Sequence, residues 1–138
     1  MFDGFELKRI KTENADINLR IGGQGEALIL LHGYPQTHAC WHKIAPILME
    51  NFTVIMPDLR GYGDSIGPDP DIDNQLYSKR AMARDIKHVL NDLSIEAASV
   101  VGHDRGGRVA YRFALDHPDR IRRLVVLDII PTSEMWEK

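Results

Sequence analysis

The stretch that decides the fold reads Val100-Val101-Gly102-His103-Asp104-Arg105-Gly106-Gly107-Arg108. In it an apolar run ends, a carboxylate stands between glycines, and a helix begins. Gly102 and Gly106 flank Asp104 in the pattern G-x-Nu-x-G, in which a strand turns into a helix within one residue. Such a turn strains the middle residue and leaves no room for Cβ atoms beside it, so glycines are needed. The pattern predicts a nucleophile elbow that exposes Asp104, with a carboxylate where serine is usual.

The composition is that of an ordinary soluble domain. The 138 residues are 43% hydrophobic and 27% charged, and the net charge is -3. Basic residues are scattered among acidic ones, no apolar stretch approaches a membrane span, and residues 1–6 lack the features of a signal peptide. We therefore expect a cytoplasmic protein with neither nucleic-acid nor membrane partners. Cys40 is the single cysteine, and we expect it to be a small buried residue.

Strand and helix signals alternate along the chain. Apolar or alternating runs predict six strands: Glu6–Lys11, Ala15–Ile21, Ala27–Leu31, Phe52–Met56, Ala97–Val101 and Ile121–Leu127. Helical spacing predicts one helix from Trp41 to Leu48 with a kink at Pro46, a second after Ser78 as N-cap, and a third that Pro118 stops. The alternation predicts an α/β domain with a mostly parallel sheet, which binds ligands at the carboxyl ends of its strands.

Four polar loops follow those carboxyl ends: His32 to Gln36, Asp58 to Ser65, His103 to Arg108, and Asp128 onward. We expect His32 and His103 to anchor their loops. The cluster Gly22-Gly23-Gln24-Gly25 lacks the lysine of a phosphate loop and is interpreted as a turn. His38 and His42 have a spacing that suits zinc, but no glutamate lies between them, so no metal site is predicted.

A carboxylate nucleophile limits the chemistry of the elbow. A carboxylate that attacks an sp3 carbon displaces a leaving group and forms an alkyl ester, which water can hydrolyse at the carboxyl carbon. Asp104 therefore indicates dehalogenation or epoxide opening. Hydrolysis of the ester needs donors for the oxyanion, and the backbone N–H groups of Tyr34 and Arg105 would supply them. The alternative is that Asp104 merely caps the following helix.

Arg105 and Arg108 indicate an anionic substrate. Three residues apart, they share one face of the first helical turn, where the helix dipole disfavours cations. A substrate carboxylate would compensate them, and they would offset its repulsion from Asp104. The alternative is that both arginines pair with acidic residues of the protein.

Three motifs carry a resemblance to a known family: His32-Gly33-Tyr34-Pro35, Asp58-Leu59-Arg60-Gly61-Tyr62-Gly63-Asp64-Ser65, and the elbow itself. On these motifs the chain resembles the N-terminal half of an α/β-hydrolase. Within that fold it is similar to the fluoroacetate (haloacetate) dehalogenases, relatives of haloalkane dehalogenases and epoxide hydrolases. The resemblance implies a partial core domain over residues 1–138, with strands in the order 1-2-4-3-5-6 and the cap and C-terminal part absent.

The resemblance also implies roles for named residues. In the dehalogenases the positions of Arg105 and Arg108 hold the substrate carboxylate, whereas epoxide hydrolases typically carry tryptophan where Arg105 stands. Asp128 resembles the acid that orients the catalytic histidine. As a lone residue after a strand, Asp128 equally suits capping of the next turn. No cofactor is implied.

No histidine follows Asp128, so we expect the base and the halide-binding cap to lie outside this chain. The leading interpretation is the catalytic half of a haloacid dehalogenase, inactive alone, whose reactants are a small anionic haloacid and water. The alternatives are an epoxide hydrolase and a non-catalytic carboxylate-binding or interaction domain. The strand Ile121–Leu127 would form an open edge, so we expect self-association or pairing with the missing C-terminal half.

Overall fold

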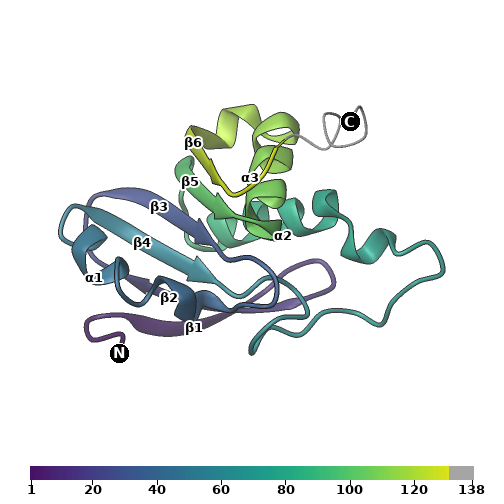
Figure 1. The fold of residues 1–138 in the computed structure, drawn as a ribbon, viewed down its shortest axis with the longest axis horizontal. Helices are drawn as coiled ribbons and strands as arrows, with labels where there is room; N and C mark the ends of the chain where they lie inside the picture. Colours follow the sequence, from purple (N-terminus) through teal and green to yellow (C-terminus); the bar gives the residue numbers. More distant parts are fainter. Residues whose placement is uncertain (131–138) are drawn as a thin grey trace.

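The computed structural model describes residues 1–130, which form one six-stranded sheet with helices on both faces (Figure 1). The strands are β1 (Glu6–Lys11), β2 (Asp16–Gly22), β3 (Glu26–Leu31), β4 (Phe52–Pro57), β5 (Ala98–His103) and β6 (Ile121–Leu127). Their order is β1-β2-β4-β3-β5-β6, which confirms the predicted order. β2 pairs antiparallel with β1 and β4, and the remaining pairs are parallel.

Two longer helices cover one face of the sheet. α2 (Lys79–Asp92) and α3 (Arg105–Asp116) pack on each other and on the central strands, around a core that includes Ile29, Ile86 and Phe113. Ser78 caps α2 by accepting a hydrogen bond from the Ala81 N–H at 3.1 Å, as its sequence predicts. Short 3-10 turns lie at η2 (Gln75–Tyr77), before α2, and at η3 (Pro118–Arg120), after α3.

Within residues 1–130, the other face of the sheet carries two short elements, η1 (His38–Trp41) and α1 (Ala45–Leu48). Trp41 and Ala45 pack there on alternate residues of β3, Leu28 and Leu30. Ile29 and Leu31 point into the core on the α2 and α3 side, so β3 is buried on both faces, as its continuous apolar run predicts.

The predicted single helix from Trp41 to Leu48 is wrong. Trp41 ends η1, and α1 begins separately at Ala45, with Pro46 in its first turn. Proline has no N–H, and its ring clashes with the carbonyl four residues before it. A helix that runs in from Trp41 therefore cannot continue through Pro46, and the chain starts a new turn there.

The prediction that Cys40 is buried is also wrong, because its side chain is exposed. In a 3-10 turn, residues three apart lie above each other, so a turn of four residues turns only one face inward. His38 and Trp41 occupy that inner face and are buried. Cys40 lies between them on the outer side.

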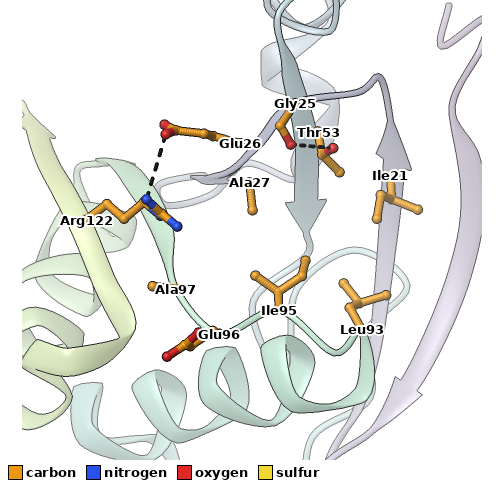
Figure 2. A pocket seen from close by; sticks show the side chains of 10 residues that line it. All are labelled: Ile21, Gly25, Glu26, Ala27, Thr53, Leu93, Ile95, Glu96, Ala97 and Arg122. Atoms are coloured by element: carbon orange, nitrogen blue, oxygen red, sulfur yellow. Dashed lines mark hydrogen bonds and ion pairs between the residues drawn. The ribbon is translucent and has the colours of Figure 1, made fainter.

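A cavity of about 400 Å³ lies at the end of the sheet opposite the elbow (Figure 2). Its wall is apolar, with Leu93 and Ile95, and it reaches Ala97 just before β5. At its rim Glu26 and Arg122 form an ion pair of 3.7 Å, and both side chains are more than half exposed. Because this cavity lies at the amino ends of the parallel strands, it is separate from the loops where the sequence places the chemistry.

Among residues 1–130, no helix has both the length and the apolar character that a membrane crossing requires.

Candidate active site

The backbone at Asp104 has the strand-turn-helix form that the elbow pattern predicts. Asp104 lies between the last residue of β5 and the first residue of α3, with φ 53° and ψ -117°. This left-handed φ is uncommon for a residue with a side chain and is typical of a strained functional turn. A Cβ on Gly106 would lie 2.3 Å from the Leu31 carbonyl oxygen, and one on Gly102 would lie 2.3 Å from the Gly106 carbonyl oxygen. Only glycine permits the close crossing of β5, α3 and β3.

The Asp104 side chain does not act as a helix cap. It forms no capping hydrogen bond to α3, and Oδ2 instead accepts the backbone N–H of Tyr34 at 2.9 Å. The hydrogen bond from Tyr34 is the main cause that lowers the pKa of Asp104. Partial burial opposes it, and the Arg105 backbone N–H and the charges of His103 and Arg105 lower the pKa further. The group is therefore an ionised carboxylate at neutral pH.

The two backbone donors predicted as an oxyanion hole both interact with this carboxylate. Tyr34 reaches it because Gly33 has no side chain: a Cβ there would lie 2.6 Å from the Asp104 Cβ. The Gly33 N–H donates to Gln36 Oε1 at 3.0 Å, which closes the loop after β3. The same Gln36 oxygen lies 3.2 Å from His103 Nδ1, so the loop is also tied to the end of β5.

His32 anchors the loop after β3 to the loop after β4. Its ring is fully buried, and Nε2 accepts the Leu59 N–H at 2.9 Å. Since Nε2 is an acceptor, the proton lies on Nδ1, which donates to the Gly33 carbonyl at 2.9 Å. His32 thereby ties the Gly33 carbonyl, which belongs to the same peptide group as the Tyr34 N–H, to the loop after β4, consistent with an anchoring role.

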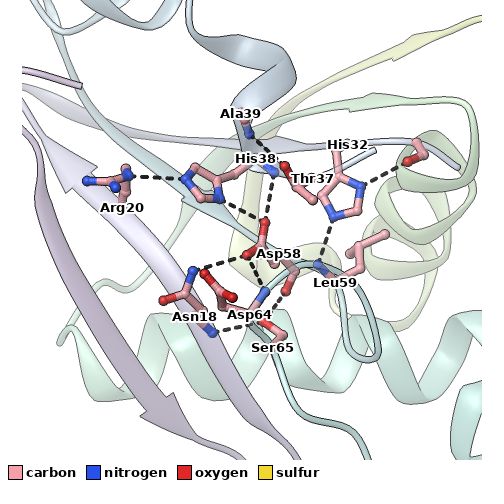
Figure 3. Close-up of polar contacts among 11 residues, drawn as sticks. Asn18, Arg20, His32, Thr37, His38, Ala39, Asp58, Leu59, Asp64 and Ser65 are labelled. Atoms are coloured by element: carbon pink, nitrogen blue, oxygen red, sulfur yellow. Dashed lines mark hydrogen bonds and ion pairs between the residues drawn. The ribbon is translucent and has the colours of Figure 1, made fainter. Parts of the chain in front are cut away.

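A second buried polar group fixes the loop after β4 (Figure 3). The Asp58 carboxylate accepts the ring Nδ1–H and the backbone N–H of His38, both at 2.8 Å. It also accepts the Asn18 side-chain amide at 3.0 Å and the Asp64 N–H at 3.1 Å. Arg20 Nε donates to His38 Nε2 at 3.1 Å, so the His38 ring is held on both sides. His38 is thus part of this buried polar cluster. The sequence analysis did not predict that role for it.

The free energy of unfolding is expected to fall as the pH drops below 6.5, the ordinary value of histidine, because folded His32 resists protonation. Burial is the main cause that lowers the pKa of His32, and the hydrogen bond with Gly33 and the charge of Asp58 oppose it. Below pH 6.5 the unfolded chain takes up a proton that the folded chain does not, so acid favours unfolding. Urea unfolding at several pH values measures this slope, to which one histidine contributes at most about 1.4 kcal/mol per pH unit.

His32→Gln is expected to flatten this slope, and His88→Gln, on α2, is the matched control. An unchanged slope in His32→Gln would contradict the assignment.

Asp58 causes a second loss of folding stability at lower pH. Its burial raises the pKa, but four hydrogen bonds outweigh burial and hold the pKa well below 3.8. Its stabilising effect is therefore complete above about pH 3.8 and is lost as the pH falls toward the folded pKa.

Cationic groups gather beside Asp104. The Arg105 guanidinium stacks over the Tyr34 ring, 5.1 Å from its centroid, and Nη1 donates to the Tyr62 hydroxyl. Arg108 follows on the first turn of α3. Lys79 begins α2, and its pKa is lowered first by burial and then by the charges of Arg105 and Arg108.

Lys79 and Tyr62 are two residues of this site that sequence reasoning missed. Tyr62 lies in the quoted motif after β4, and only the folded loop shows that its hydroxyl meets Arg105. Lys79 follows the capping Ser78, and its approach to the arginines depends on how α2 packs against α3. Asp104 counters these cations, since its charge raises the pKa of Lys79.

Asp128 follows β6 at the same end of the sheet. Asp104 N–H donates to the Leu127 carbonyl at 2.9 Å, so the end of β6 lies directly beside the elbow. The Asp128 carboxylate lies 3.1 Å from His103 Nε2 and its side chain is 81% exposed. One of its oxygens therefore contacts His103, and the group remains open to solvent.

Comparisons with known proteins agree with the fold. Residues 26–138 match the family model described as alpha/beta hydrolase fold. The chain is 49% identical over its full length to a fluoroacetate dehalogenase from Burkholderia sp, covering 45% of that protein. It is 47% identical over 109 residues, 79% of the chain, to a soluble epoxide hydrolase from Corynebacterium sp. (strain C12), covering 36% of it.

The solved structures that the chain resembles include an alpha/beta hydrolase from Nostoc sp PCC 7120, with a TM-score of 0.97 and 54% identity. That match covers 100% of this chain and 47% of the other. The chain thus spans less than half the length of the curated relatives it matches. With the elbow, the sheet order and these matches together, the chain belongs to the α/β-hydrolase fold family.

Proposed function

We propose that the complete protein cleaves the carbon–halogen bond of a small haloacid, converting haloacetate to glycolate and halide through an ester on Asp104. The observation that carries this proposal is an ionised carboxylate at the elbow, held by the Tyr34 N–H, next to the cations of Arg105 and Lys79. The relative named fluoroacetate dehalogenase, 49% identical over the whole chain, supports it.

In the first step the second oxygen of Asp104, Oδ1, attacks the carbon that bears the halogen. The new C–O bond forms as the C–X bond breaks, and the halide leaves with the bonding electrons. Oδ2 is bound to the Tyr34 N–H and becomes the carbonyl oxygen of the ester. The two oxygens of one carboxylate thus have different roles.

In the second step water adds to the Asp104 carboxyl carbon. Negative charge develops on Oδ2, where the Tyr34 N–H already lies, and the Arg105 N–H also interacts with this carboxyl group, so both donors are in place before the reaction. One proton of the water passes to a general base, which returns it to the leaving alkoxide oxygen as the intermediate collapses to glycolate, and the other proton is released when Asp104 ionises again. We propose that the base is a histidine oriented by Asp128 and supplied from outside these 138 residues, because the chain spans less than half the length of the relatives it matches.

The cations near Asp104 suit an anionic substrate. A haloacid carboxylate would otherwise be repelled by the Asp104 charge. Arg105 and Arg108 can bind it through charge-assisted hydrogen bonds, and the positive end of α3 adds to the attraction. Lys79 supplies a further positive charge at the site.

Arg108→Leu in the complete enzyme is expected to lower kcat/KM for chloroacetate by about 10- to 150-fold, or on the order of 1.5–3 kcal/mol. The neutral analogue chloroacetamide should lose much less, because it has no charge to pair. Halide release measures both. Arg112→Leu, one turn further along α3 where the arginine pairs with Asp116, is the matched control. Equal losses for the acid and the amide would mean that Arg108 supports the fold instead.

The second candidate is epoxide hydrolysis, which the 47% identity to a soluble epoxide hydrolase favours. It would use the same Asp104 ester and oxyanion donors, but a neutral epoxide has no need of the arginine pair. Comparison of kcat/KM for chloroacetate and for a neutral epoxide separates the two activities. Binding of haloacetate and acetate with no halide release would indicate a non-catalytic carboxylate-binding domain.

A further inference from the structure

Two tyrosines from different loops hold the Arg105 guanidinium. The Tyr62 hydroxyl, from the loop after β4, accepts a hydrogen bond from Arg105 Nη1. The Tyr34 ring, from the loop after β3, lies under the guanidinium at 5.1 Å. The two rings meet edge to face, with centroids 6.4 Å apart and an interplanar angle of 87°. The arginine is thus fixed by one directional bond and one stacking contact.

Tyr62 is itself fixed by the buried framework of the site. Its ring packs on the buried His32 ring at 5.4 Å, with an interplanar angle of 66°. Its N–H donates to the Leu59 carbonyl at 2.9 Å, and its carbonyl accepts the Ser65 N–H at 3.0 Å. His32 also bonds to the Leu59 N–H, so the ring and the backbone of Tyr62 depend on the same anchor.

We propose that Tyr62 is a positioning residue that orients Arg105 and so sets the preference of the site for carboxylate substrates. A guanidinium has five N–H donors in one plane, and it binds a carboxylate best through two parallel hydrogen bonds. Tyr62 engages one donor and fixes the plane, which leaves the others oriented for an anion. The inference rests on the proposed function, because Arg105 is the group through which Tyr62 acts.

The test is Tyr62→Phe in the complete enzyme, which removes the hydroxyl and keeps the ring that packs on His32. The KM for chloroacetate and the inhibition constant of acetate are each expected to rise about tenfold, with kcat nearly unchanged. The KM for chloroacetamide should not change. Tyr77→Phe is the matched control, since the Tyr77 hydroxyl also bonds within this part of the chain, to the Pro68 carbonyl.

A double-mutant cycle separates positioning from general support of the fold. In an Arg105→Leu background, Tyr62→Phe should weaken acetate binding no further, because Tyr62 acts on the anion through the Arg105 guanidinium, which this variant lacks. An additive loss in that background, an equal loss for chloroacetamide, or unchanged acetate binding in the single variant would each overturn the proposal.

The same variants distinguish failure of the inference from failure of the proposed function. If the wild-type enzyme opens epoxides but releases no halide from chloroacetate, the proposed function is wrong. Acetate inhibition of epoxide opening then reports on anion binding by Arg105 and Arg108. A weaker inhibition in Tyr62→Phe would still support the positioning role, and an unchanged one would overturn it.

Discussion

A single turnover of the complete enzyme in water enriched with heavy oxygen is expected to place the label in the carboxylate of Asp104. The label enters there because the hydrolytic water attacks the carboxyl carbon of the ester and not the substrate carbon. Mass spectrometry of the peptide that contains the elbow measures it. Label found only in the product after the first turnover would contradict the covalent mechanism.

Replacement of Asp104 by Ala should give the largest loss of activity, on the order of 10⁴- to 10⁶-fold in kcat, since no other group can form the ester. Asp119→Ala is the matched control, because Asp119 is exposed and lies in η3, after α3. Circular dichroism should show both variants folded. Retention of halide release within about tenfold would assign the chemistry to another group.

The parts of the fold that could be predicted from the sequence are those that local patterns control. The apolar run of β3 and the capping Ser78 of α2 each act within a few residues, and the structure confirms both. The strand order came from the resemblance to a known family and is also confirmed. The segment around Pro46 was predicted wrongly because apolar spacing continues through it, while the proline interrupts the backbone hydrogen bonds.

The site divides in the same way. Asp104 and Arg105 are adjacent in one motif, so the elbow pattern alone predicts the turn between β5 and α3, and the structure has this turn. The contact between Tyr62 and Arg105 joins residues 43 positions apart, and that between His38 and Asp58 joins residues 20 positions apart. Such contacts depend on how loops from different strands pack together, and no local pattern in the sequence encodes them.

The isolated residues 1–138 are expected to associate, because β6 forms an apolar edge of the described sheet. Leu124, Val125, Val126 and Leu127 are between 39% and 46% exposed. Among residues 1–130, β6 pairs with β5 on one side only, so its other backbone edge can pair with another chain. Light scattering should show species larger than a monomer. Val125→Lys, which adds a charge to the edge, should reduce association, and Leu115→Lys, at an exposed site on α3, is the control.

The same residues are expected to release at most one halide per chain from chloroacetate. Asp104 can form the ester, but its hydrolysis needs a general base. We propose that this base comes from a part of the protein that corresponds to the relatives' sequence beyond the region matched by residues 1–138. Addition of that part in trans should pair with β6 and restore turnover, and Val125→Lys should weaken this rescue. Sustained turnover by residues 1–138 would contradict the proposal that the base comes from outside them. If the active species were a monodisperse monomer, the predicted association through β6 would be wrong as well.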